Sequence, residues 1–128
     1  MKTIGTICAA LMAVAGAAAA DPVHGTWKTQ PDDGSYALVE MSNCGGNICG
    51  KIARTFNGSG EYKSPNLGKT LVMDMKPNGN GSYEGRVWRP SNDKIYIGKM
   101  SLNGNSLALR GCVAGGLICS KQTWSRVN

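Results

Sequence analysis

The sequence predicts a small all-β protein, an eight-stranded antiparallel up-and-down barrel stapled by disulfide bonds. After residue 21, short runs with strand-like alternation are separated by Gly, Asn, Pro and Asp, a pattern typical of β-strands and turns. The first and last of these runs, residues 24–29 and 122–127, are of similar type and each contains a tryptophan. A first strand that pairs with a last strand closes a barrel. Cysteines beside the turns complete the prediction.

The chain begins with the pattern of a secretory signal peptide. Lys2 precedes an apolar run from Ile4 to Gly16, and the run is followed by small residues ending at Ala20. This order is typical of a cleavable signal, and the apolar run is too short to span a membrane. We therefore expect residues 1–20 to be a signal peptide and residues 21–128 to be a single barrel domain with no membrane span, periplasmic or secreted.

Turn signals divide the mature chain into eight strands. Gly45-Gly46 and residues 77–81, 90–93 and 103–104 are the clearest turns. Asp32-Asp33-Gly34 is also interpreted as a turn, because it lacks the further spaced oxygen ligands of a calcium loop. Residues 57–68 form a polar loop without periodicity. The predicted strands are residues 24–29, 35–42, 47–55, 70–76, 82–89, 94–102, 107–112 and 122–127.

Turn positions also predict which side chains share a face of the sheet. Asn103-Gly104 is a two-residue type I′ signal, which places Met100 opposite Leu107 and Gly98 opposite Leu109. Four hairpins treated in this way each separate an apolar face from a charged one, and this agreement supports the predicted sheet. The charged face collects Glu40, Lys51, Asp74, Glu84, Arg86, Lys99 and Arg110.

The mature chain has four cysteines, Cys44, Cys49, Cys112 and Cys119. In an oxidising compartment they indicate two disulfides rather than a metal site. The strand registers place Cys112 opposite Cys119 and Cys44 diagonally across a turn from Cys49, so each pair can close locally. Such short loops contribute about 2–2.5 kcal/mol each in the chain-entropy model. Crossed pairings, such as Cys44 with Cys112, stay open.

Charge and composition argue against several classes of function. Without Lys2 the chain has 13 basic and 8 acidic residues, and the basic ones are scattered singly. Nucleic-acid binding normally needs a basic stripe or patch, so we expect no nucleic-acid partner. His24 is the only histidine and has no evident nucleophile partner. We therefore expect a protein that is not an enzyme and that uses no cofactor and no metal.

Two resemblances follow from the first and last strands. Gly25-Thr26-Trp27, together with Trp124 and Arg126, resembles the lipocalin-type barrel, where a Gly-x-Trp on the first strand packs beneath an arginine from the last. The resemblance implies that Trp27, Trp124 and Arg126 close one end of the barrel, with a cation–π contact between Trp27 and Arg126 worth about 0.5–2 kcal/mol.

The second resemblance runs along nearly the whole mature chain, to a bacterial exported family known as domain of unknown function 2147. This chain departs from the family pattern at Asn92-Asp93, where Asp-Gly is usual, and carries the bulky Trp88-Arg89 before Pro90. The family has no established activity, so the resemblance implies export and a small β-barrel. The similar segments are Gly25-Thr26-Trp27, residues 44–52, 85–90, 94–99 and 110–112, and residues 122–127.

The predicted interior suggests a binding function. Inward-facing glycines beside methionine and tyrosine leave space for a small apolar or amphipathic ligand. The alternative is a filled core, because an eight-stranded barrel is near the limit between a packed interior and room for one small ligand. A second alternative is a structural or protein-interaction module of the cell envelope that acts through its outer surface. The ligand-binding candidates are Met73, Met75, Tyr83, Gly85, Tyr96, Gly98 and Met100.

Overall fold

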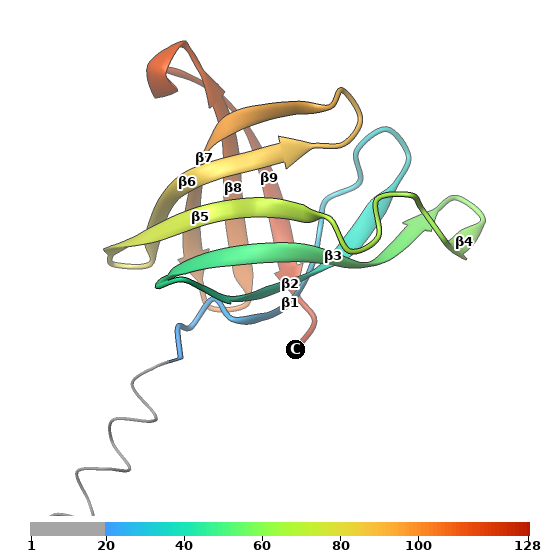
Figure 1. Ribbon diagram of the computed structural model, residues 1–128, viewed down its shortest axis with the longest axis horizontal. Helices are drawn as coiled ribbons and strands as arrows, with labels where there is room; N and C mark the ends of the chain where they lie inside the picture. Colours follow the sequence, from blue (N-terminus) through green and yellow to red (C-terminus); the bar gives the residue numbers. More distant parts are fainter. Residues whose placement is uncertain (1–19) are drawn as a thin grey trace, which may run out of the picture.

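A computed structural model describes residues 20–128, which form one antiparallel sheet closed into a barrel (Figure 1). The predicted signal peptide lies outside the described residues except for Ala20. Within residues 20–128 no helix is long and apolar enough to cross a membrane. The elements are β1 (Gly25–Lys28), β2 (Tyr36–Cys44), β3 (Asn47–Asn57), β4 (Gly60–Tyr62), β5 (Thr70–Gly79), β6 (Ser82–Arg89), β7 (Lys94–Asn103), β8 (Ser106–Val113), the short 3₁₀ turn η2 (Ala114–Gly116) and β9 (Ile118–Arg126).

The barrel closes as the sequence predicts. Eight of the strands pair with their neighbours along the chain, and β9 returns to β1 through Trp27 opposite Arg126 and Lys28 opposite Ser125. The predicted eight-stranded barrel is therefore confirmed, and the structure also contains two disulfide bonds, Cys44–Cys49 and Cys112–Cys119. The ninth strand, β4, extends β3 as a small hairpin within the loop predicted at 57–68. All three of its residues are exposed, so an alternation of apolar and polar residues could not reveal it.

One predicted turn lies a single residue further along the chain. Asn103 pairs with Ser106, so Gly104 and Asn105 are the central residues. Met100 consequently faces Leu109 rather than Leu107, and Gly98 faces Gly111 rather than Leu109. The predicted pairing is wrong by two residues, but the faces are correct because side chains alternate with a period of two. Glycine at the first central position is typical of a type II′ turn.

A β-bulge in β5 overturns the predicted position of Met73. The register between β5 and β6 shifts between Met73 and Lys76, and Asp74 has a φ of 49°. An extra residue reverses the alternation of faces along a strand. Val72 and Met75 are therefore both fully buried, while Met73 is only partly buried and Asp74 is exposed.

The N-terminal segment 21–24 covers one end of the barrel. Trp27 is fully buried, and its indole Nε1 donates a hydrogen bond to the carbonyl of Val23 at 2.9 Å. The Arg126 guanidinium lies 4.4 Å from the centre of the Trp27 ring. The same guanidinium donates hydrogen bonds to the carbonyls of Pro22 and His24 at 2.7 and 3.1 Å. This end, called the closed end below, is thus covered by apolar side chains, and the carbonyl groups of Pro22, Val23 and His24 accept hydrogen bonds there.

Candidate functional site

The opposite end of the barrel contains a cavity of about 540 Å³, within the range of small-molecule sites. Its mouth lies between the β1–β2 loop, the segment that follows β4 and the β6–β7 turn. Its floor is apolar because each of six strands contributes one inward-facing apolar side chain to it. Those floor residues, all buried, are Ala37, Ile52, Leu71, Val87, Leu109 and Trp124.

The β1–β2 loop holds polar side chains over this mouth. Asp33 and Gly34 have φ angles of 57° and 81°, as in a type I′ turn. The backbone groups of Asp32 and Ser35 bond to each other across this turn at 2.8 and 3.1 Å. The loop is also tied to β9, because the Gln30 side-chain oxygen accepts a hydrogen bond from the backbone of Thr123 at 3.0 Å. Asp32 is therefore held in a defined position.

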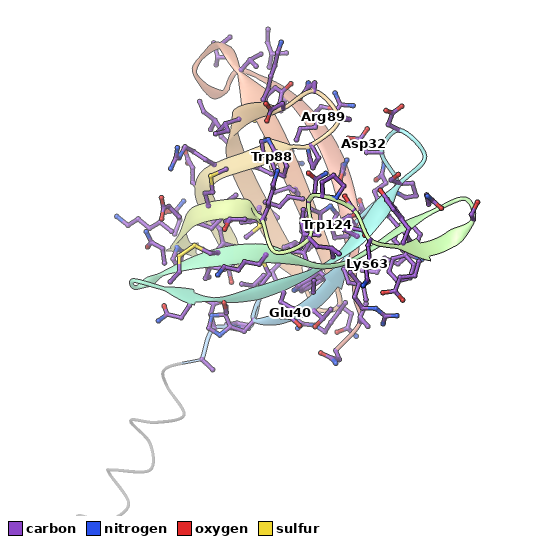
Figure 2. The ribbon with its side chains drawn as sticks, turned by 45° about the vertical axis from the view of Figure 1, so that its right-hand side comes forward. Asp32, Glu40, Lys63, Trp88, Arg89 and Trp124 are labelled. Atoms are coloured by element: carbon purple, nitrogen blue, oxygen red, sulfur yellow. A yellow bond between two sulfur atoms is a disulfide. The ribbon has the colours of Figure 1, made fainter. Side chains whose placement is uncertain are left out.

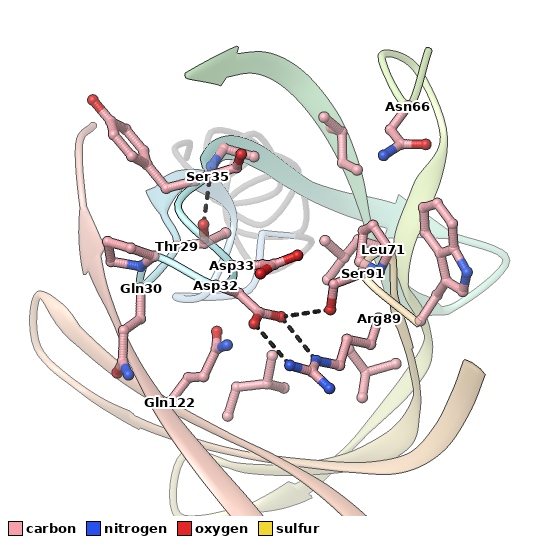
Figure 3. Close-up of a pocket in the computed structure, with 18 of the residues that line it drawn as sticks. Thr29, Gln30, Asp32, Asp33, Ser35, Asn66, Leu71, Arg89, Ser91 and Gln122 are labelled. Carbon is pink, nitrogen blue, oxygen red and sulfur yellow. Dashed lines mark hydrogen bonds and ion pairs between the residues drawn. The ribbon is translucent and has the colours of Figure 1, made fainter. Parts of the chain in front are cut away.

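An ion pair bridges the mouth from Asp32 to Arg89. Arg89 Nε and Nη2 each donate to an Asp32 carboxylate oxygen at 2.8 Å, and the Ser91 hydroxyl adds a bond at 3.2 Å (Figure 3). Figure 2 shows both residues at the same end of the barrel. The hydrogen bonds from Arg89 lower the pKa of Asp32, against the opposing effect of partial burial. Asp32 therefore remains a carboxylate across the neutral and mildly acidic range.

The residues expected to bind a ligand lie mostly away from this cavity. Tyr96 lines it, and its hydroxyl accepts a hydrogen bond from Asn92 Nδ2 at 2.7 Å. The Tyr83 hydroxyl donates to Asp21 at 2.6 Å towards the closed end, where burial, with a contribution from Asp21, raises its pKa. Met75 and Met100 are buried in the core.

The two predicted pocket glycines, Gly85 and Gly98, lie where the interior is filled. A Cβ atom on Gly98 would lie 2.5 Å from Met75 Cε, and one on Gly85 would lie 2.5 Å from the carbonyl oxygen of Asp74. Gly111, by contrast, lines the cavity, and its nearest neighbours would be in ordinary van der Waals contact. The barrel is therefore filled towards the closed end and hollow towards the mouth.

Sequence reasoning missed the polar residues of the mouth, above all Asp32 and Arg89. Two local signals pointed towards them. Asp33-Gly34 is a strong two-residue hairpin signal, and Trp88-Arg89 places a large cation directly before Pro90 and the predicted β6–β7 turn. Their pairing was not evident, because the two residues are 57 positions apart in the chain.

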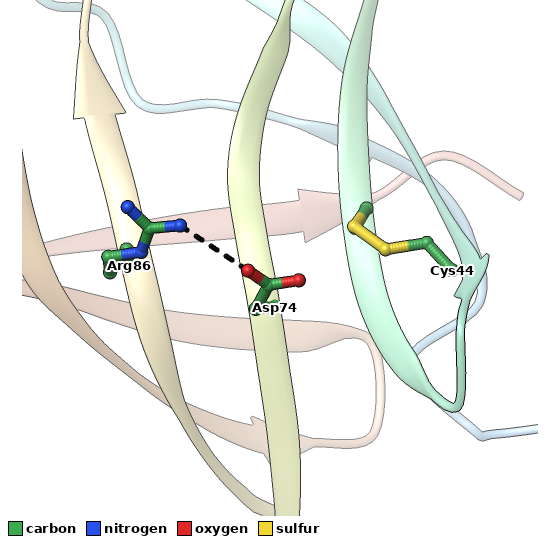
Figure 4. The surroundings of a disulfide bond; sticks show 4 residues. Cys44, Asp74 and Arg86 are labelled. Atoms are coloured by element: carbon green, nitrogen blue, oxygen red, sulfur yellow. Dashed lines mark hydrogen bonds and ion pairs between the residues drawn. A yellow bond between two sulfur atoms is a disulfide. The ribbon is translucent and has the colours of Figure 1, made fainter.

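The cysteines form the two local pairs, Cys44–Cys49 and Cys112–Cys119, with Cα–Cα distances of 5.8 and 4.1 Å. This result excludes the crossed pairing. Cys44 and Cys49 lie near Asp74, a grouping that resembles metal ligands (Figure 4). Both sulfur atoms are used in the disulfide, however, and Asp74 accepts a hydrogen bond from Arg86 at 3.3 Å. This group therefore presents no thiolate to a metal.

Comparison with a solved structure shows the same fold. Protein HP1028 from Helicobacter pylori, described as belonging to the lipocalin family, superposes with a TM-score of 0.68 at 18% identity, covering 83% of each chain. Fatty-acid-binding protein 1 from Echinococcus granulosus is a weaker match, with a TM-score of 0.49 at 13% identity, covering 84% of this chain and 98% of the other.

Sequence comparisons identify the family. No curated protein sequence matches the chain closely enough to count as a relative. The model of the family described as "uncharacterized protein conserved in bacteria" matches residues 25–126. That match begins with β1 and ends with β9, so it spans the whole barrel. The chain therefore belongs to this bacterial family, DUF2147.

Proposed function

We propose that the protein binds a small apolar or amphipathic molecule in the open-end cavity, without chemical change to that molecule. The observation that carries the proposal is the cavity itself, with an apolar floor beneath a polar mouth. An apolar tail on the floor would displace water from buried side chains, at about 25 cal/mol per Å² of apolar surface removed from water. The ligand's polar group would remain at the mouth.

The arrangement of the mouth supports binding rather than catalysis. Asp32 is held as a carboxylate by Arg89, and its oxygens accept three hydrogen bonds from Arg89 and Ser91. A general acid or base works best with a pKa near the operating pH, whereas the pKa of Asp32 is moved away from neutrality. The pair is better suited to positioning the β1–β2 loop beside a ligand.

We also propose that the protein is exported to the periplasm or beyond the cell. The signal-peptide pattern of residues 1–20 supports export, and so do the two disulfides, which persist mainly in oxidising compartments. Fractionation of the native host tests this location. A full-length, uncleaved protein in the cytoplasm would contradict it.

Filling the cavity tests the binding proposal. Gly111→Leu places a side chain into the cavity from a position where a Cβ meets Tyr96 and Val87 at 3.5 Å or more. We expect it to reduce uptake of the amphipathic fluorescent probe 1-anilinonaphthalene-8-sulfonate at least about tenfold, since the space for the probe is lost. Gly58→Leu is the matched control, because Gly58 is exposed and has no neighbour within 4 Å. Equal probe binding by both folded variants would refute the cavity as the site.

Native mass spectrometry of protein purified from its own host then separates the two function classes. A co-purified small molecule that is lost in Gly111→Leu would support the binding proposal. An empty barrel with a specifically bound protein would favour the alternative, a structural or interaction module of the cell envelope that uses its outer surface.

A further inference from the structure

The β8–β9 hairpin carries an exposed apolar tip that projects beyond the neighbouring strands (Figure 1). Leu117 is 86% exposed, Ile118 64% and Val113 46%. Val113 and Ile118 are directly paired, and on the neighbouring β7 Ile95 is also exposed. Single exposed apolar residues are normal on protein surfaces, but here they are gathered at one tip. This clustering indicates a contact surface.

The conformation of the tip is held by contacts that do not involve the side chains of Val113, Leu117 or Ile118. The Cys112–Cys119 disulfide closes its base. Lys99 Nζ donates to the carbonyl of Gly116 at 3.4 Å, and the Leu117 amide donates to the carbonyl of Ala114 at 3.4 Å. The apolar residues are therefore presented on a preorganised support, which lowers the entropic cost of binding.

Positive charge is concentrated on the strands behind the tip. Lys99 pairs with Arg110, and Arg110 pairs with Lys121, so three cations lie side by side across β7, β8 and β9. Like charges directly opposite on neighbouring strands are destabilising. Residues 94–128 contain five basic and no acidic residues, whereas residues 21–93 contain eight of each. The net positive charge of the mature chain therefore comes entirely from residues 94–128, which include β7, β8 and β9.

We propose that the β8–β9 tip docks on an anionic lipid surface, with Val113, Leu117 and Ile118 inserted and the row Lys99–Arg110–Lys121 at the level of the phosphates. Lys121 follows Leu117 by four residues, about 13 Å at the rise of a β-strand. Interfacial segments bury their apolar face about 5–10 Å deep, and long basic side chains can extend forward to the headgroups. The spacing therefore fits a membrane interface.

The shape of the tip favours a bilayer over a protein. A stable protein interface buries about 800 Å² on each partner, whereas this is a narrow two-stranded projection with a few apolar side chains. Gly111 and Ser120, which line the cavity, are paired on the same face as Val113 and Ile118, two positions further from the tip along the hairpin. Docking would therefore bring the cavity mouth towards the lipid. This inference goes beyond the ligand-binding proposal, and its test needs no bound ligand.

Co-sedimentation of the mature protein with lipid vesicles tests the docking. We expect binding to phosphatidylcholine vesicles that contain roughly 30% phosphatidylglycerol, and much weaker binding to phosphatidylcholine alone, because basic side chains near an anionic surface favour association. Leu117→Ser with Ile118→Ser should weaken binding at least about tenfold through the lost apolar contact. Arg110→Gln with Lys121→Gln should weaken binding to the anionic vesicles by a similar factor.

Two matched controls separate docking through the tip from non-specific adsorption to the vesicles. Val127→Ser removes an apolar side chain that is 50% exposed at the closed end. Lys51→Gln with Lys63→Gln removes two exposed cations from the neutral part of the chain. Both should bind vesicles within about twofold of the parent, since neither lies at the tip. The proposal would be overturned if the parent protein stayed in the supernatant with anionic vesicles, or if folded tip variants bound the vesicles like the parent. The exposed apolar tip would then be a contact surface for a protein partner.

Discussion

Replacing Gly85 or Gly111 with alanine should change stability in opposite directions. A Cβ on Gly85 would lie 2.5 Å from the carbonyl oxygen of Asp74 and 2.6 Å from that of Met73. Both oxygens belong to the backbone of the β5 bulge and cannot rotate away. A Cβ on Gly111 would find Tyr96 at 3.5 Å and Val87 at 3.7 Å, which are ordinary contacts.

The expected difference between the two variants is about 3–4 kcal/mol. Overpacking a filled interior costs about 1–3 kcal/mol, and Gly85→Ala should fall at the upper end because a strand must shift. Gly111→Ala should gain about 0.4–1 kcal/mol, because alanine reduces the conformational entropy of the unfolded chain. In a domain of this size 1 kcal/mol corresponds to about 4–8 °C in Tm, so the two melting temperatures should differ by at least about 12 °C.

Urea denaturation followed by tryptophan fluorescence measures the difference, with thermal melting as a second probe. Gly58→Ala serves as the control, since no atom lies within 4 Å of its added Cβ. A Gly85→Ala variant as stable as the parent would show that the β5 bulge does not crowd this position. A Gly111→Ala variant that loses about 1 kcal/mol or more would show that the open half is packed, which would remove the cavity.

Three further predictions concern closure, the mouth and the disulfide beneath the tip. Trp27→Ala should cost about 3–5 kcal/mol in urea denaturation, because it empties a fully buried site, and an unchanged midpoint would contradict this closure. Arg89 lowers the pKa of Asp32 in the folded state, so the stabilisation is complete above the ordinary value of 3.8 and is lost as the pH falls through the lower folded value. Hydrogen exchange of the β1–β2 loop should report this loss in the parent but not in Asp32→Asn. Cys112→Ser with Cys119→Ser should cost about 2–2.5 kcal/mol in thermal melting, and a smaller loss would mean that strand pairing alone holds the hairpin.

The strands and the barrel could be predicted because their signals are local. Gly45-Gly46 has φ angles of 65° and 92°, as a two-residue type I′ turn requires, and alternation on either side sets the faces. The register predicted for the last hairpin placed Cys112 opposite Cys119, and the structure shows this pairing. The β5 bulge could not be predicted in this way, because Asp74 adopts a left-handed conformation that no neighbouring residue demands.

The order of the strands and most of their inward and outward faces could be predicted from the sequence, because these features depend on residues close together in the chain. The sequence left local and crossed cysteine pairings open, and the structure shows the local pairs. The position of the hollow part of the barrel, by contrast, depends on contacts between distant strands. Gly98 and Gly111 are paired on neighbouring strands and face the same interior, yet Met75 fills the space at Gly98 and leaves Gly111 open to the cavity. Which glycine borders a cavity depends on side chains that reach across the interior from distant strands. The same is true of the mouth, where Asp32 and Arg89 meet only because the closed barrel places their two loops at the same end.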